Sequence, residues 1–155
     1  MMPTFNAAKF AEYIRGHKNP VVVAGGGCDR IRLDGKLLVD YAAEVARKLG
    51  CPVAATGNTV LAIKKDETIK TKKMWLAELF RYLQDKWAEP LLDNRPDLLV
   101  LIGYRPEAID GMISGLKRVH TVHLGPGKAL SANKSVAALP FSQWKENLDD
   151  LIRAL

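Results

Sequence analysis

The stretch VVVAGGGCDR, residues 21–30, decides the fold of this chain. Pro20 introduces a short, unbroken apolar run, and three glycines end it. Such a run is typical of a parallel strand that is buried on both faces of a sheet. The glycines leave two interpretations open. They form either a loop that binds a phosphate or a tight turn that leaves a buried strand.

Strand-like and helix-like segments alternate along the rest of the chain. Helical spacing of apolar residues predicts helices over residues 4–15, 34–49 and 74–87, from Pro106 through Leu116, and after Ser142, with Thr4 and Ser142 as caps. Short apolar runs predict further strands at residues 52–55, 98–102, 119–124 and 136–139. The lysine-rich residues 64–73 are expected to form either an exposed linker or the approach to the next helix. We therefore expect an α/β fold, a three-layer, Rossmann-like parallel sheet with helices on both faces, in one domain over residues 1–155.

Composition narrows the class of protein. The chain has 155 residues, 48% of them hydrophobic, which is enough for a core, and a net charge of +6. The basic residues are scattered outside residues 64–73 and are not interleaved with aromatic residues, so no nucleic-acid partner is expected. Without a signal sequence or a long apolar run, the chain is expected to be cytoplasmic, with no membrane partner. Cys28 and Cys51 lie outside any C-x-x-C pattern, so we expect free thiols and no zinc or iron–sulfur site.

The chemistry is expected where the strands end. In an open parallel sheet, ligands bind beyond the carboxyl ends of the strands, at the point where the strand order reverses. Four predicted strands end with glycine nearby, and glycine lets the backbone approach a ligand closely. The predicted cofactor-binding residues are Gly25, Gly26, Gly27, Cys28, Thr56, Gly57, Asn58, Gly103, Tyr104, Arg105 and Gly125. Their backbone amides would bind an anionic flavin or nucleotide.

Two common nucleotide motifs are absent. The dinucleotide fingerprint needs a glycine where Arg30 stands, and the second strand ends in Thr56-Gly57-Asn58 rather than in an acidic residue. The P-loop pattern fails as well, because Lys128 is followed by Ala129. An ordinary NAD site or P-loop is therefore not expected.

No catalytic residue and no metal ligand is predicted. His120 and His123 lie three residues apart on a strand, so they point to opposite faces and cannot chelate one metal ion, and His17 is expected in a loop. Cys28 is either a reactive thiol or a small packing residue, and we expect packing. Arg105 either reaches a phosphate or is a surface charge.

The three tryptophans are expected to pack between helices and sheet. They are Trp75, Trp87 and Trp144, each in a predicted helix. An exposed tryptophan would instead indicate an interface with another protein, where aromatic residues are enriched.

Several segments together resemble one known family. NAAKFAEYIRGHKNPVVVAGGG, AAEVARKLGCPVAATGNT, PDLLVLIGY and VHTVHLG resemble the epsilon subunit of the archaeal acetyl-CoA decarbonylase/synthase complex, which contains a nickel–iron carbon monoxide dehydrogenase. The resemblance runs in order through nearly the whole chain, to the final LDDLIRAL. It implies a DHS-like NAD/FAD-binding domain that acts as a non-catalytic accessory subunit. The partner would be the large alpha catalytic subunit, in a two-plus-two assembly.

The resemblance also bears on cofactors. It implies a role in passing electrons to a flavin, with FAD at low affinity as the expected ligand. No intrinsic redox centre is expected, because the sequence lacks the ligands for a metal cluster. Gly25–Gly27, Thr56-Gly57 and Gly103 match the family's strand ends, whereas the lysine-rich residues 64–73 depart from it. The same strand ends resemble the middle domain of thiamine-diphosphate enzymes and the flavin domain of electron-transfer flavoproteins. A stand-alone flavin- or nucleotide-binding domain is therefore the alternative.

Overall fold

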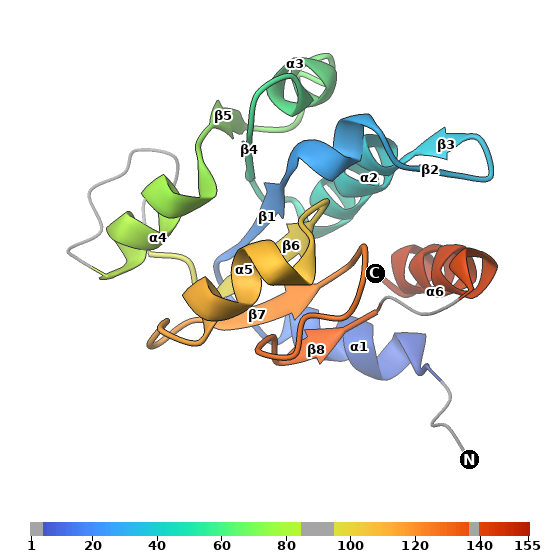
Figure 1. The fold of residues 1–155 in the computed structure, drawn as a ribbon. Coiled ribbons are helices and arrows are strands. Elements are labelled where there is room, and N and C mark those ends of the chain that lie inside the picture. Colours follow the sequence, from blue (N-terminus) through green and yellow to red (C-terminus); the bar gives the residue numbers. More distant parts are fainter. Residues whose placement is uncertain (1–4, 85–94, 137–139) are drawn as a thin grey trace.

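A six-stranded parallel sheet forms the centre of the computed structural model, which describes residues 5–84, 95–136 and 140–155 (Figure 1). The strand order is β5-β4-β1-β6-β7-β8, and each neighbouring pair is parallel. The strands are β1 (Pro20–Ala24), β4 (Val53–Ala55), β5 (Thr71–Lys73), β6 (Leu98–Ile102), β7 (His120–His123) and β8 (Lys134–Ser135). Because β1 has β4 on one side and β6 on the other, the strand order reverses between β1 and β6.

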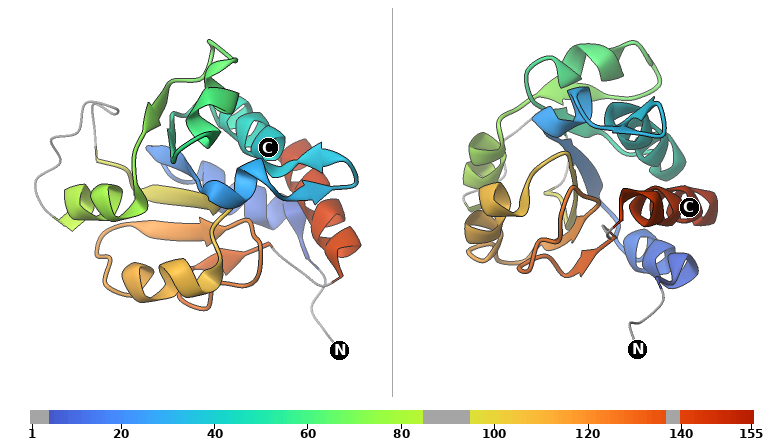
Figure 2. Two further views of the ribbon diagram at one scale, coloured as in Figure 1. Left: turned by 45° about the horizontal axis from the view of Figure 1, so that its top comes forward. Right: turned by 45° about the vertical axis from the view of Figure 1, so that its right-hand side comes forward.

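Helices cover both faces of the sheet, as the sequence predicted (Figure 2). One face carries α1 (Ala7–Arg15), α2 (Leu38–Leu49), α3 (Thr59–Lys64) and α6 (Phe141–Ala154), and the other carries α4 (Leu76–Gln84) and α5 (Pro106–Ile113). Consecutive residues of β1 point to opposite faces of the sheet. Val22 packs against the first group of helices and Val23 against the second. The unbroken apolar run of β1 is thus explained by burial on both sides.

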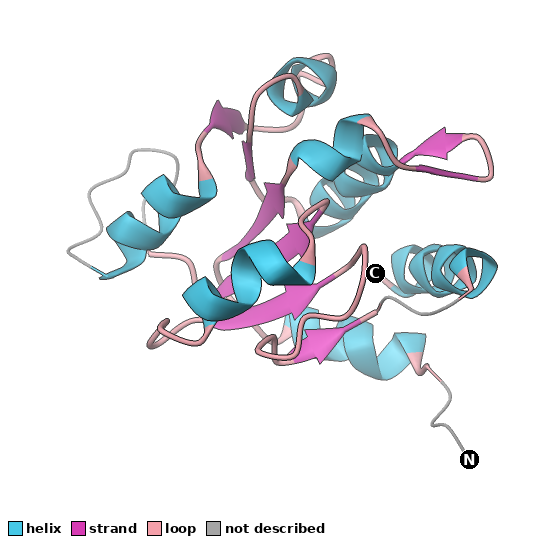
Figure 3. Ribbon diagram, in the orientation of Figure 1, coloured by secondary structure: helices cyan, strands magenta, loops and turns pink. Residues whose placement is uncertain are grey.

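A hairpin lies where the sequence predicted the start of a helix. Residues 34–37 were expected to be helical, but α2 begins at Leu38, and β2 (Arg32–Leu33) pairs antiparallel with β3 (Lys36–Leu37) (Figure 3). Asp34 and Gly35 form the turn with φ values of 53° and 83°. Asp-Gly is a preferred pair for such a turn, so the sequence did carry this signal.

The lysine-rich segment is also more ordered than expected. The connection expected over residues 64–73 is shorter than predicted, because α3 ends at Lys64 and β5 occupies Thr71–Lys73 at the edge of the sheet, which leaves residues 65–70 between them. Asp66 shapes the connection between them, since its carboxylate accepts a hydrogen bond from the Thr68 amide at 2.9 Å and pairs with Arg47 at 2.7 Å. Lysines on an edge strand discourage pairing with a second sheet, which accounts for β5 being so basic.

Several predicted boundaries are corrected. Asn6 caps α1 by accepting a hydrogen bond from the Lys9 amide, whereas Thr4 lies outside the described residues. Ser142 does not cap α6, which already begins at Phe141 after Pro140.

The last strand is β8, at Lys134–Ser135 rather than at 136–139, of which residues 137–139 lie outside the described part of the chain. The fourth predicted helix ends at Ile113, so Leu116 follows it. The third, α4, begins at Leu76, and residues 85–87 are outside the described range.

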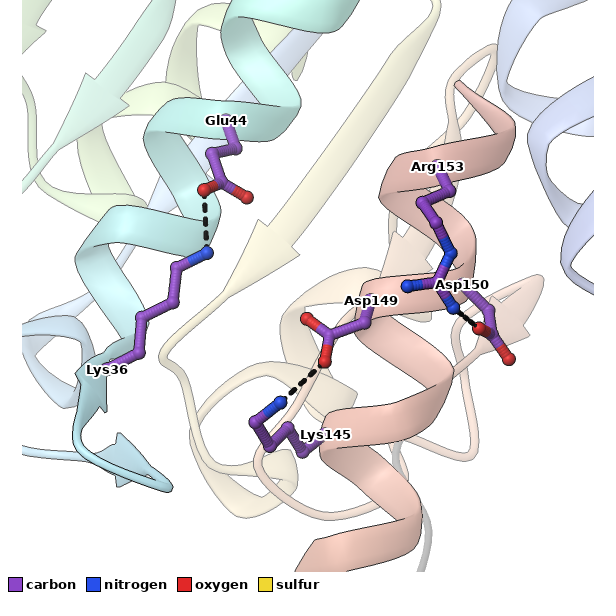
Figure 4. Close-up of polar contacts among 6 residues, drawn as sticks. All are labelled: Lys36, Glu44, Lys145, Asp149, Asp150 and Arg153. Carbon is purple, nitrogen blue, oxygen red and sulfur yellow. Dashed lines mark hydrogen bonds and ion pairs between the residues drawn. The ribbon is translucent and has the colours of Figure 1, made fainter.

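Ion pairs link the hairpin to α2 and join neighbouring turns within α6 (Figure 4). Lys36 of β3 pairs with Glu44 of α2 at 2.6 Å, and Lys145 pairs with Asp149 within α6 at the same distance. The second pair lies on the side of α6 that faces α2. These pairs are partly exposed, so each contributes little to stability.

Within residues 5–84, 95–136 and 140–155, none of the helices has the length and apolar character that a membrane crossing requires.

Candidate functional site

The predicted site residues gather along one edge of the sheet. Gly25 and the short 3₁₀ helix η1 (Gly26–Asp29) follow β1, residues 56–58 follow β4, residues 103–105 follow β6, and Gly125 lies two residues beyond β7. Since β4, β1, β6 and β7 are adjacent in the sheet, these four segments are neighbours at the carboxyl edge. The sequence therefore predicted their common location correctly. Whether they bind a ligand stays a prediction.

The loops after β1 and β6 are closed on each other by backbone hydrogen bonds. The Gly25 amide donates to the Ile102 carbonyl at 2.8 Å, and the Gly27 amide donates to the Gly103 carbonyl at 2.9 Å. The Gly103 amide in turn donates to Gly125 at 2.8 Å, and the Cys28 amide donates to Gly25 at 3.0 Å. These four amides are used inside the protein, so an anion cannot receive hydrogen bonds from them in this conformation.

The glycines in these loops make room for the chain itself. A Cβ atom on Gly25 would lie 2.8 Å from the Tyr104 ring, and one on Gly27 would lie 2.7 Å from the Gly103 carbonyl oxygen. A Cβ on Gly125 would collide with the indole of Trp144, whose Nε1–H donates to the Leu124 carbonyl at 2.7 Å. The close approach that the sequence assigned to a ligand is therefore made here by neighbouring loops and aromatic rings.

An exposed rim remains outside this closed centre. Gly26 is exposed, and the nearest atom to a Cβ placed on it would be Nη2 of Arg30, at 3.9 Å. Gly57, with a φ of 49°, has open space around its Cα, and the neighbouring Asn58 is exposed as well. Arg105 is exposed at the start of α5. We refer to Gly26, Arg30, Gly57, Asn58 and Arg105 as the rim, and a ligand at this edge would meet the rim first.

Cys28 is a packing residue rather than a reactive thiol. Its side chain is fully buried, and its Sγ lies 3.5 Å from the Ile102 carbonyl oxygen. Burial and, secondarily, the charge of Asp29 raise the pKa of the Cys28 thiol far above its ordinary value. A thiol that is neither exposed nor ionised is a poor nucleophile, so the packing interpretation holds.

Tyr104 and His123 hold the centre of the edge together. Nε2–H of the buried His123 donates to the Tyr104 carbonyl at 2.8 Å, while its Nδ1 makes no hydrogen bond of ordinary geometry within the described residues, although the Gly127 backbone is near the ring. Desolvation lowers the pKa of His123, and burial raises the pKa of Tyr104. The Tyr104 hydroxyl is buried close to Thr56 and makes no hydrogen bond of ordinary geometry within the described structure. Both side chains are neutral at pH 7 and act as packing elements.

The three tryptophans have different outcomes. Trp144 is buried between α6 and the sheet, as predicted. Trp75 is not packed, because 68% of its surface is exposed just before α4, two residues after β5. Trp87 lies outside the described residues. Leu61 on α3 is also exposed, at 66%. The expectation that Trp75 packs between helix and sheet is therefore wrong.

Sequence reasoning missed a contact at the opposite edge of the sheet. His17 follows α1 and His120 begins β7, and their rings meet with Nε2 of His17 2.8 Å from Nδ1 of His120. His120 is exposed while His123 is buried, so the two histidines of β7 do point apart as predicted. The partner that the sequence reasoning had set aside was His17, which lies 103 positions away in the chain.

Comparison with known proteins supports the fold and goes no further. No protein-family model matches the chain. One similar solved structure is a Mycobacterium smegmatis protein that is provisionally described as a thiamin diphosphate-dependent enzyme, with a TM-score of 0.52 and 18% sequence identity. The match covers 94% of this chain and 27% of the other, so the present chain corresponds to about a quarter of that protein. At this identity the likeness concerns the Rossmann-like α/β architecture alone.

Proposed function

We propose that the chain is a non-catalytic accessory subunit of a nickel–iron carbon monoxide dehydrogenase/acetyl-CoA decarbonylase-synthase complex. It docks on the large alpha catalytic subunit, in a two-plus-two assembly. The observation that carries this proposal is the closed carboxyl edge, where the loop amides are bonded within the chain, Cys28 is buried, and Tyr104 covers Gly25. With the Cys28 thiol buried and these amides bonded within the chain, neither is available to a substrate at this edge. The family resemblance of the sequence supplies the partner.

The docking surface is centred on Trp75. Its large apolar ring is exposed beside the basic edge of the sheet, where Lys73 is exposed too. Tryptophan is among the residues that contribute most to binding at protein interfaces, because it removes a large area from water at a small entropic cost. A partner that covers Trp75 would remove this large apolar surface from water.

The contribution to electron transfer is assigned to the rim. A flavin bound to the complex would meet Gly26, Gly57 and Arg105, which are exposed at the carboxyl edge. FAD alone would bind weakly there, because the amides of Gly25, Gly27 and Gly103 are already used in internal hydrogen bonds.

To test the proposal, the tagged chain is used to capture a dehydrogenase from native extract. Iron and nickel are then measured in the recovered fraction. We expect Trp75→Ala to lower recovery at least about tenfold, as for an interface residue worth roughly 2 kcal/mol. Leu130→Ala is the matched control, because Leu130 is 82% exposed on the loop between β7 and β8, away from Trp75. Wild-type chain that recovers no metal-cluster dehydrogenase would refute the proposal.

A second candidate function is a flavin- or nucleotide-binding domain related to the middle domain of thiamine-diphosphate enzymes. The fold likeness to the Mycobacterium smegmatis protein favours this candidate over the first. The test is calorimetry of the isolated chain with FAD, FMN and NAD, for the wild type and for Gly26→Val. The variant should fold, because Gly26 has no positive φ and a Cβ has room there. Tight flavin binding that Gly26→Val abolishes would favour this second function, and tight NAD binding would contradict the fingerprint argument.

A further inference from the structure

We propose that His17 and His120 form a two-histidine binding site for a divalent transition-metal ion of the zinc, nickel or copper type. The site lies at the amino edge of the sheet, opposite the rim, and it does not depend on the proposed function. The two imidazole rings stand at 90° to each other with their centroids 5.1 Å apart, and one nitrogen of each ring faces the other at 2.8 Å.

The hydrogen bonds determine where the protons are. Nδ1 of His17 lies 2.9 Å from the Tyr13 carbonyl oxygen, which can only accept, so Nδ1 of His17 carries a proton. In the neutral ring, Nε2 of His17 then presents a lone pair, and Nδ1 of His120 donates its proton to that lone pair. The site therefore contains one proton held between two nitrogens, both of which are good ligands for borderline metal ions.

A metal ion can replace that proton with little movement. Zinc–nitrogen bonds are about 2.0–2.1 Å, so two nitrogens on a tetrahedral ion stand about 3.3 Å apart. The two nitrogens need to separate by about half an ångström from their present 2.8 Å, and the rings to turn until both lone pairs point at the ion. The proton on Nδ1 of His120 is lost and its Nε2 gains one from water, so the charge on the protein is unchanged. Water completes the coordination, because His120 is exposed.

The surroundings hold both rings in place. The Tyr13 carbonyl that accepts from His17 is a typical partner behind a metal-ligating histidine, where it fixes the tautomer. The Tyr13 ring packs against both imidazoles, with centroids 5.1 Å from His17 and 6.1 Å from His120. Asp97 connects the two segments, because its carboxylate accepts from the amides of Lys18 and Asn19 and its carbonyl accepts from the His120 amide. The pair is thus positioned before any metal arrives.

Two features limit the site. The described residues contain no group of three or more metal-ligating side chains, so the protein supplies two ligands and the affinity is moderate. Lys134 places its Nζ 5.1 Å from the centroid of the Tyr13 ring, which adds a nearby positive charge. Hard ions such as Mg²⁺ prefer oxygen ligands and should not bind.

The experiment measures binding of Zn²⁺ and Ni²⁺ to the full chain by calorimetry, and the shift in melting temperature that each ion causes. We expect one ion per chain, a higher melting temperature with the ion, and no response to Mg²⁺. His17→Ala and His120→Ala should each weaken binding at least about tenfold, since even outer partners of metal ligands are typically worth 10- to 100-fold. Lys134→Ala, on the same surface, should not weaken it.

Metal binding that survives in the His17→Ala/His120→Ala double variant would overturn the proposal, as would wild-type protein without a binding signal. Circular dichroism of each variant checks the fold independently. His17→Gln, which keeps a polar side chain of similar size, provides a second route if an alanine variant is unstable.

Discussion

Gly26 and Gly27 are chain neighbours, yet a methyl group fits at only one of them. At Gly26 the nearest atom is the flexible end of Arg30 at 3.9 Å, while at Gly27 it is the backbone oxygen of Gly103 at 2.7 Å. We expect Gly26→Ala to be neutral or to stabilise by about 0.5 kcal/mol, through the unfolded chain. Gly27→Ala should cost about 2 kcal/mol or more, because backbone atoms must shift. Denaturant unfolding of both variants measures this difference. Equal stabilities would show that the loops after β1 and β6 are not closed on each other.

His123 should make stability depend on pH. Its ordinary pKa is about 6.5, and desolvation lowers the pKa in the folded chain. Between those two pKa values the unfolded chain binds more protons than the folded chain. The free energy of unfolding therefore has its full value above about pH 6.5 and falls as the pH drops below 6.5. His123→Gln keeps a donor for the Tyr104 carbonyl and cannot titrate. Its unfolding free energy should fall less between pH 7.5 and pH 5, as measured by urea denaturation. The same slope in both proteins would contradict this account.

Two glycines in or next to helices differ in whether the backbone requires a glycine there. Gly50 ends α2 with a φ of 63°, as the sequence predicted, whereas Gly111 lies exposed inside α5 with open space around it. Gly50→Ala should therefore destabilise the chain by about 1 kcal/mol, and Gly111→Ala should stabilise it by about 0.5–1 kcal/mol. Thermal unfolding of the pair compares the same chemical change in two backbone conformations. Destabilisation by both would mean that α5 is not a regular helix at Gly111.

Apolar elements could be predicted from the sequence, down to the three-residue β4, whereas the short strands that contain charged residues were not predicted. The apolar runs of β1 and β6 and the spacing in α2 are strong signals, because burial on two faces or on one stripe repeats over several residues. β2 and β3 have two residues each and β5 has three, too few to show a period. β5 is also basic, and its position is set by pairing with β4 rather than by its own composition.

The position of the candidate site could be predicted from the sequence, but the closure of its loops on each other could not. The carboxyl edge follows from the parallel order of the strands. That Tyr104 covers Gly25, and that Gly27 contacts Gly103, depends on contacts between separate loops. The meeting of His17 with His120 has the same cause, because it arises only when α1 and β7 are packed into one molecule. Contacts of this kind leave no periodic mark in a sequence.

At the scale of the whole molecule, both thiols are enclosed by the fold. Cys28 follows the carboxyl end of β1, and Cys51 precedes the amino end of the parallel neighbour β4, so they lie at opposite ends of this pair. Both are free and buried, and burial raises the pKa of Cys51 to about 12. Both thiols of the folded protein should react slowly with a thiol reagent. In unfolded, non-reduced protein, two free thiols per chain should react. Rapid reaction of either thiol in folded protein would show that the core opens easily.

The place of β1 in the sheet has a consequence during synthesis. β1 lies between β4 and β6, and β6 is far along the chain. Ribosomes add about 5–20 residues per second, so for several seconds the apolar strand has emerged with one edge unpaired. The nascent chain is then most prone to pair with another copy of itself. A chaperone that binds short apolar segments would be most useful to this protein before β6 is made, and of little use afterwards.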